Sequence, residues 1–64
     1  MMTFIVRTFN EEWTIGCSNL NVAVSKVLDS YSNPETATVD VFDDDCAYIY
    51  FDGHLEATID RING

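Results

Sequence analysis

Residues 46–60 read CAYIYFDGHLEATID, two runs of alternating side chains that meet at Asp52-Gly53. Alternation at every second position, in runs rich in aromatic and β-branched residues, is typical of β-strands. An Asp-Gly pair between two such runs is a strong signal for a tight hairpin turn. We therefore predict a β-hairpin with strands at 46–51 and 54–60.

The register of this hairpin decides which side chains reach the core. A two-residue loop would place Ile49 opposite Glu56 and mix aliphatic with acidic residues on each face. A three-residue loop with a left-handed glycine would pair Ile49 with Leu55 and gather the aliphatic residues on one face. We predict the three-residue loop, whose inward side chains are Leu55, Ala57 and Ile59. The side chains expected to point away from the core are Tyr48, Tyr50, His54, Glu56, Thr58 and Asp60.

The stretch before this hairpin predicts another strand of the same kind. Residues 36–42 alternate, with small aliphatic side chains on one face and Thr38, Asp40 and Phe42 on the other. The run Asp43–Asp45 then forms a turn, because aspartate favours turn conformations. The second half of the chain is thus expected to hold three strands.

Farther upstream the hydrophobic period changes from two to between three and four. An apolar stripe at this spacing begins at Leu20 and continues to Tyr31, which predicts an amphipathic helix. Ser18 is the predicted N-cap. Asn33-Pro34 is expected to end the helix, because the residue before a proline avoids the helical region.

The N-terminal stretch predicts a second hairpin. Two strand-like runs, 3–9 and 12–17, are separated by two residues that can turn the chain. A two-residue loop would pair Val6 with Ile15. The face expected to be buried then holds Phe4, Val6, Trp13, Ile15 and Cys17.

The predicted order of elements is strand, strand, helix, strand, strand, strand, or ββαβββ. We expect an α+β fold, with a small antiparallel sheet and one helix packed on one face of it. The length allows one domain, which spans residues 1–64. A single helix cannot cover both faces of the sheet, so the second face is open to water or to a partner.

The charge balance limits the possible partners. Eleven carboxylates oppose three basic residues, and the formal net charge is −8. Nucleic acids and anionic membranes attract cationic surfaces, so this charge argues against direct binding to either. The natural complement is the basic surface of another protein.

The sequence also indicates where the protein works. It has no pattern typical of a secretion signal, and no apolar run approaches the roughly 18 residues that suggest a membrane span. Cys17 and Cys46 are too few for a disulfide framework. We expect a cytoplasmic protein in which both thiols are reduced.

No arrangement typical of catalysis is found in the sequence. His54 lies beside a turn without a nucleophile in a recognisable motif, and it is expected to be solvated. Cys17 is expected to be buried, and the aspartates before Cys46 would raise the pKa of that thiol rather than activate it. The run Asp43–Asp45 lacks the glycine and closing glutamate of a calcium loop, and no zinc-ligand spacing occurs. We therefore expect neither an enzyme nor a need for a metal or cofactor.

The candidate functional surface is a set of acidic and aromatic residues. Glu56, Thr58 and Asp60 would lie in a row, with successive side chains about 6.6 Å apart. Tyrosines on an open sheet face supply rigid contact area with a polar tip, although ordinary cross-strand packing explains them equally well. The predicted partner-binding residues are Asp40, Asp43, Asp44, Asp45, Tyr48, Tyr50, Glu56 and Asp60.

In its size, its acidity and its lack of catalytic residues, the chain resembles the small acidic inhibitor proteins of phages and mobile elements. These include anti-CRISPR and anti-restriction proteins, some of which are DNA mimics. The resemblance implies an inhibitor that occupies a basic nucleic-acid-binding surface of a host defence or nucleic-acid enzyme, in the host cell cytoplasm. The alternative is a structural or regulatory module that forms a homodimer through its tyrosine-bearing face or an exposed strand edge.

Overall fold

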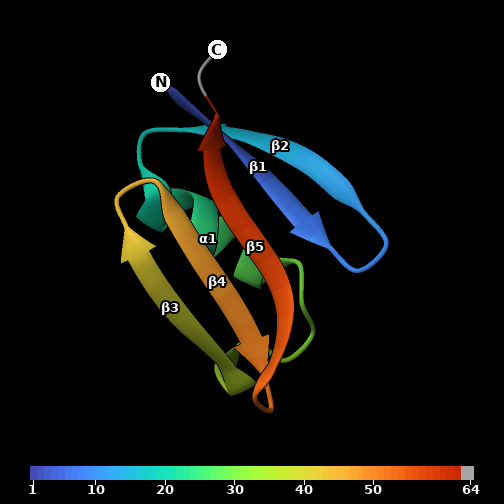
Figure 1. The fold of residues 1–64 in the computed structure, drawn as a ribbon. Coiled ribbons are helices and arrows are strands. Elements are labelled where there is room, and N and C mark those ends of the chain that lie inside the picture. Colours follow the sequence, from blue (N-terminus) through green and yellow to red (C-terminus); the bar gives the residue numbers. More distant parts are fainter. Residues whose placement is uncertain (63–64) are drawn as a thin grey trace.

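The computed structural model describes residues 1–62, which form five β-strands and one α-helix (Figure 1). These elements follow the predicted order ββαβββ, so the expected α+β fold is confirmed. A short 3₁₀ helix, η1 (Pro34–Thr36), leads from the helix into the third strand. The other elements are β1 (Met2–Thr8), β2 (Glu12–Cys17), α1 (Leu20–Asp29), β3 (Ala37–Asp43), β4 (Cys46–Phe51) and β5 (His54–Ile62).

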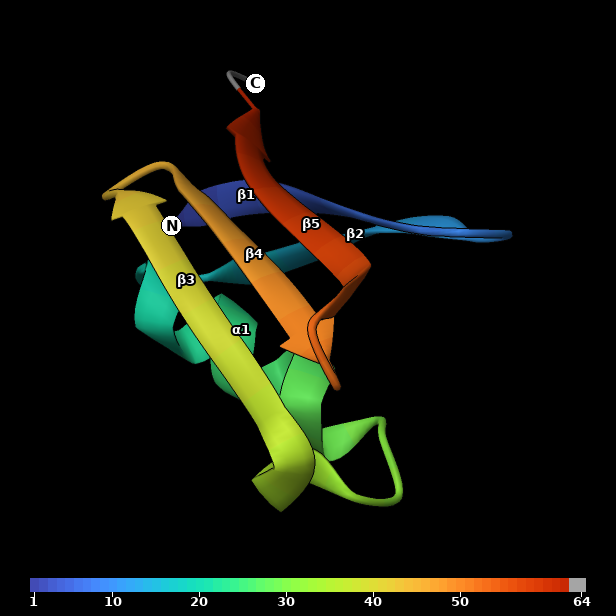
Figure 2. The same cartoon turned by 60° about the horizontal axis from the view of Figure 1, so that its bottom comes forward.

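The strands form one antiparallel sheet in the order β2-β1-β5-β4-β3. The central strand, β5, pairs with β1, so the first and last strands of the chain lie side by side with Val6 opposite Ile59. α1 lies across one face of the sheet, as two views of the ribbon show (Figures 1 and 2). Within residues 1–62 no element covers the opposite face.

The core lies between α1 and the covered face of the sheet. The helix contributes four buried side chains at the expected spacing, those of Leu20, Ala23, Val24 and Val27. The sheet contributes Phe4, Val6, Cys17, Ala47, Ile49, Ala57 and Ile59. Burial of each large apolar side chain stabilises the fold by about 1.5–3 kcal/mol. The predicted inward face of the N-terminal hairpin is confirmed, since Trp13 and Ile15 also pack against this core.

Both ends of α1 differ from the prediction. The N-cap is Asn19 rather than Ser18, and its side-chain oxygen accepts a hydrogen bond from the Val22 backbone N–H at 3.0 Å. The helix ends at Asp29, before the predicted stop, with Ser30 as its C-cap. Tyr31 therefore lies outside the helix, where its ring packs against that of Phe51 with centroids 4.8 Å apart. This aromatic contact, rather than helical geometry, accounts for the apolar side chain at that position.

The N-terminal hairpin has a longer loop than predicted. Val6 lies opposite Trp13 rather than Ile15, so the register differs by two residues. The turn is closed by the Thr8 backbone N–H, which donates to the Glu11 carbonyl at 2.9 Å. A shift of two residues keeps each side chain on its face, and so the predicted burial survives the wrong register.

The β4–β5 hairpin turns in two residues, not three. Asp52 and Gly53 both have positive φ, 52° and 78°, as a tight type I′ turn requires. Phe51 and His54 then face each other across the turn. After a two-residue turn, strict alternation would place Glu56 opposite Ile49. A β-bulge farther along β5 shifts the register, so that Ala57 lies opposite Ile49 and the aliphatic side chains still share the core face.

Because of the bulge, two predictions for this hairpin are wrong, the pairing of Ile49 with Leu55 and the inward orientation of Leu55. Tyr50 lies opposite Leu55, and the next pair is Ile49 with Ala57, so Glu56 is the extra residue. Leu55 therefore points away from the core, with 52% of its surface exposed, and the predicted inward orientation is wrong. Figure 2 shows the strong bend in β5 near its start.

Candidate protein-binding surface

We call the uncovered side of the sheet the open face, to which all five strands contribute. The strand pairings place on it Thr3, Ile5, Arg7, Glu12, Thr14, Thr38, Asp40, Cys46, Tyr48, Tyr50, Leu55, Thr58, Asp60 and Ile62. One row of cross-strand neighbours spans the whole sheet, from Asp40 through Tyr48, Thr58 and Arg7 to Glu12. The row begins and ends on a carboxylate and has a tyrosine next to one end.

Four of the predicted partner-binding residues come together on the open face. Asp40 lies directly opposite Tyr48 on the neighbouring strand, and Asp60 lies opposite Cys46. Strand spacing and rise place the Cα atoms of Asp40 and Asp60 about 12 Å apart. Tyr50 completes the group beside Tyr48 on β4, where both rings are partly exposed. The open face thus presents two separated carboxylates near Tyr48 and a second aromatic ring, Tyr50, on the same strand.

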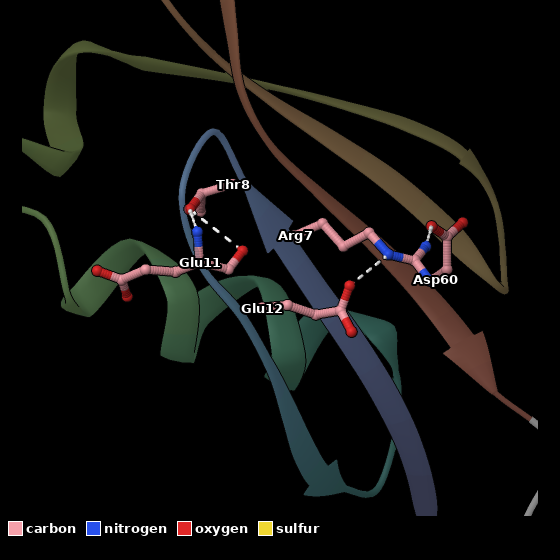
Figure 3. A network of polar contacts seen from close by, with 5 residues as sticks. All are labelled: Arg7, Thr8, Glu11, Glu12 and Asp60. Carbon is pink, nitrogen blue, oxygen red and sulfur yellow. Dashed lines mark hydrogen bonds and ion pairs between the residues drawn. The ribbon is translucent and has the colours of Figure 1, made fainter.

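Arg7 carries a positive charge on the open face, and two carboxylates form ion pairs with it. The Arg7 guanidinium donates through Nε to Glu12 Oε2 at 3.0 Å, and its Nη1 lies 3.9 Å from Asp60 Oδ2 (Figure 3). All three side chains are about half exposed, so these ion pairs add little stability. Their effect on the surface is larger, because the cation is neutralised and the net charge of the open face stays negative.

The acidic turn lies at a corner of the molecule, where it has a structural role. The Asp45 backbone N–H donates to Asp43 Oδ1 at 2.8 Å, which is an Asx turn. The Asp45 carbonyl accepts from the Arg61 backbone N–H at 2.7 Å, and Asp45 Oδ1 lies 3.4 Å from Arg61 Nη1. Two of the three predicted aspartates therefore shape and anchor this turn, while Asp44 is exposed at its tip.

Glu56 does not continue the predicted row with Thr58 and Asp60. The bulge interrupts the alternation at Glu56, which lies beyond the end of β1, at the free edge of β5. There it lines the same hollow as Trp13 and Tyr31, which belong to the helix side of the molecule. The prediction of three side chains in an evenly spaced row is therefore wrong.

The thiol on the open face is held in its protonated form. Burial is the largest cause of the raised pKa of Cys46. A hydrogen bond with Tyr48 lowers this pKa, whereas a hydrogen bond and the negative charge of Asp60, together with the charge of Asp43, raise it. The hydrogen bond with Cys46 in turn raises the pKa of the Tyr48 hydroxyl. Reactive cysteines have lowered pKa values, so this environment is the opposite of one that activates a thiolate.

A hollow outside the open face was not predicted from the sequence. The helix-end hollow, as we call it, lies where the end of α1 meets the β1–β2 loop and the start of β5, and its volume is about 390 Å³. Its aromatic and acidic lining residues are Phe9, Glu11, Trp13, Tyr31 and Glu56. They come from three separate segments of the chain. Only the sheet order and the early end of the helix bring them together.

Comparisons with protein-family models, with curated proteins and with solved structures find no match for this chain. Among residues 1–62, no helix has the length and apolar character needed to cross a membrane. The same residues contain no group of three or more His, Cys, Asp or Glu side chains placed to hold a metal ion. A functional proposal therefore rests on the two surfaces described above.

Proposed function

We propose that this chain is a non-enzymatic binding protein whose open face docks on a cationic surface of a nucleic-acid-binding protein. The observation that carries this proposal is the composition of the open face. Asp40 lies opposite Tyr48 and Asp60 lies near it, and Tyr50 adds a second aromatic ring on β4. The Arg7 charge is already neutralised by Glu12 and Asp60. Such a face attracts basic surfaces over a distance and offers aromatic area once contact is made.

The proposed target is a nucleic-acid enzyme, because its binding channel is a strongly cationic surface that already accepts anions. Carboxylates form charge-assisted hydrogen bonds with the same guanidinium and ammonium groups that hold phosphates. Occupation of such a channel would block the nucleic acid, as in inhibitors of the anti-restriction and anti-CRISPR type. The bulge at Glu56 removes the evenly spaced row, so support comes from charge and aromatic area rather than from phosphate-like spacing.

The test is displacement of DNA from purified enzymes of the restriction and CRISPR-effector type. We expect the protein to compete with a DNA duplex for one of them at 50 mM NaCl. The competition should weaken steeply by 300 mM, because exposed charges are screened at that ionic strength. Binding to such an enzyme that leaves its affinity for DNA unchanged would show that the protein is not an inhibitor of this kind.

Self-association is the second candidate, and the outward position of Leu55 favours it. Leu55 lies opposite Tyr50, so an apolar patch on the open face is larger than the tyrosines alone would make it. A homodimer through this patch should be lost in Tyr50→Ser, as measured by sedimentation equilibrium. A monomer at millimolar concentration in 0.5 M NaCl, where charge repulsion is screened, would remove this candidate.

A further inference from the structure

The helix-end hollow is separate from the open face and has a different chemical character. Trp13 and Tyr31 form partly buried aromatic walls, and Phe9 stands fully exposed at the rim. Glu11 and Glu56 supply two carboxylates. Among residues 1–62, no basic side chain lines the hollow beside these two carboxylates.

The walls of the hollow are fixed by contacts outside it. The Tyr31 ring is held against Phe51, and the Tyr31 backbone N–H donates to the Leu28 carbonyl at 3.1 Å. The loop that carries Glu11 is fixed by Thr8, whose hydroxyl accepts from the Glu11 backbone N–H at 3.2 Å (Figure 3). A ligand would therefore meet a largely preformed site, which lowers the entropic cost of binding.

Glu11, in the β1–β2 loop, lines the hollow, whereas Glu12, the first residue of β2, lies on the open face. In Figure 3 the Glu11 side chain extends away from the ion pairs that Arg7 forms with Glu12 and Asp60. Burial raises the pKa of the Tyr31 hydroxyl, and the negative charges of Glu56 and Glu11 raise it further. Both carboxylates therefore act on the same region of space, next to an aromatic hydroxyl that stays neutral.

We propose that the helix-end hollow binds one arginine side chain of a partner protein. A guanidinium stacks on aromatic rings through its planar face and donates from its edge to carboxylates. Aromatic walls with two carboxylates match both properties, whereas a purely apolar ligand would leave the carboxylates partly desolvated. The volume of about 390 Å³ is within the range of about 300–1,000 Å³ that is usual for small-ligand sites.

The sole tryptophan of the chain provides a direct readout of this site, because Trp13 lines the hollow. The probe is N-acetyl-arginine amide, added at constant ionic strength while indole fluorescence is recorded. We expect a saturable change with the arginine compound. The neutral isostere N-acetyl-citrulline amide should give none, and N-acetyl-lysine amide should bind at least threefold more weakly. Equal binding of citrulline or of lysine would overturn the proposal.

Matched variants separate the hollow from the open face. Glu11→Gln and Glu56→Gln should each weaken binding of the arginine compound about two- to fivefold, the range typical of exposed ion pairs. Phe9→Ala should also weaken it, and this fully exposed ring can be removed without disturbing the core. Glu12→Gln is the control, since its carboxylate belongs to the open face, and it should bind like the native chain.

Amide chemical shifts show where the arginine compound binds. We expect changes at Glu11, Trp13 and Tyr31, and none at Tyr48 or Asp60. Changes confined to the open face, or an equal loss of binding in Glu12→Gln and Glu11→Gln, would overturn the assignment to the hollow. This titration needs no partner protein, so its result is independent of whether the proposed function holds.

Discussion

Arg7 places a positive charge on the open face, and its two ion pairs neutralise that charge, so the net charge of the face stays negative. Its guanidinium lies between Glu12 and Asp60, on strands at either side of its own. From the sequence, Arg7 could be placed on the outward face of its strand by alternation alone. Its partners could not be identified, because Asp60 becomes its neighbour only through the pairing of β1 with β5.

Gly53 is the residue on which the β4–β5 turn depends. Its φ is 78°, and an added Cβ would meet no atom within 4 Å, so strain rather than a clash opposes substitution. Gly53→Ala should lower the free energy of unfolding by about 1–2 kcal/mol, the usual cost of a left-handed alanine. Urea denaturation measures this difference.

Gly16→Ala is the matched control for that experiment. Gly16 lies in strand β2 without a positive φ, and the added Cβ would meet only the flexible Met1 side chain, at 3.2 Å from its sulfur. Its free energy of unfolding should stay within about 0.5 kcal/mol of the native value. An equal loss in both variants would mean that φ at Gly53 is not the cause.

The raised pKa of the Cys46 thiol predicts that the stability of the fold depends on pH. Its pKa in the folded chain is raised above the ordinary value of 9.0. Below that value the thiol is protonated in both states, and its contribution to stability is fully present. As pH rises through the window above it, the unfolded chain releases its proton first, so stability falls.

The measurement is the free energy of unfolding between pH 7 and pH 10.5. It should decline above about pH 9 in the native chain, and this alkaline decline should be smaller in Cys46→Ser, which lacks the titrating thiol. Tyr31 and Tyr48 contribute in the same direction from about pH 10 upward, since both pKa values are raised. Stability that rises above pH 9 would contradict the pKa direction of Cys46.

At the scale of elements, the caps of α1 show what local sequence can and cannot specify. Ser18 and Asn19 are both good N-cap residues by type. In the structure the cap is Asn19, whose side-chain oxygen accepts from the Val22 N–H, and the buried Cys17 Sγ–H donates to the Asn19 carbonyl at 3.2 Å. Residue type alone does not distinguish two adjacent good caps, and the contacts of Asn19 on both sides of it identify the one that is used.

Asn19→Ala should lower the free energy of unfolding by about 1 kcal/mol, because it removes the acceptor for the Val22 N–H. Ser18→Ala, at the position favoured by the sequence, should change it by less than about 0.5 kcal/mol. Thermal and urea unfolding give both values. A larger effect at Ser18 would show that the helix begins one residue earlier in solution.

The strands were predictable because their alternation is strong, and β2 and β4 begin and end at the predicted residues. The bulge in β5 was not. A chain that must bury Ala57 and Ile59 after a tight turn can lengthen the turn or add a bulge, and both solutions keep the aliphatic residues together. The consequence was large for function, because it moved Glu56 to the hollow and Leu55 to the open face.

At the scale of the whole molecule, the order of strands determines both surfaces. β1 and β5 pair across nearly the full length of the chain, and no local pattern specifies such a contact. This pairing completes the open face and also brings the β1–β2 loop to the end of α1. Acidity and the uncovered face were thus predictable, whereas the location of each carboxylate depended on the topology.

Two double variants test whether the open face, rather than the total charge of the chain, binds the partner. Asp40→Asn with Asp60→Asn removes two charges from that face. Asp29→Asn with Glu35→Gln removes two from exposed residues of α1 and η1, so both double variants carry the same net charge. The measurement is the Kd of each for the target enzyme at 50 mM NaCl. The open-face variant should bind at least tenfold more weakly, and the helix-side variant should stay within about twofold of the native Kd. Equal weakening in the two would show that the open face is not the binding surface, because binding would then follow net charge alone.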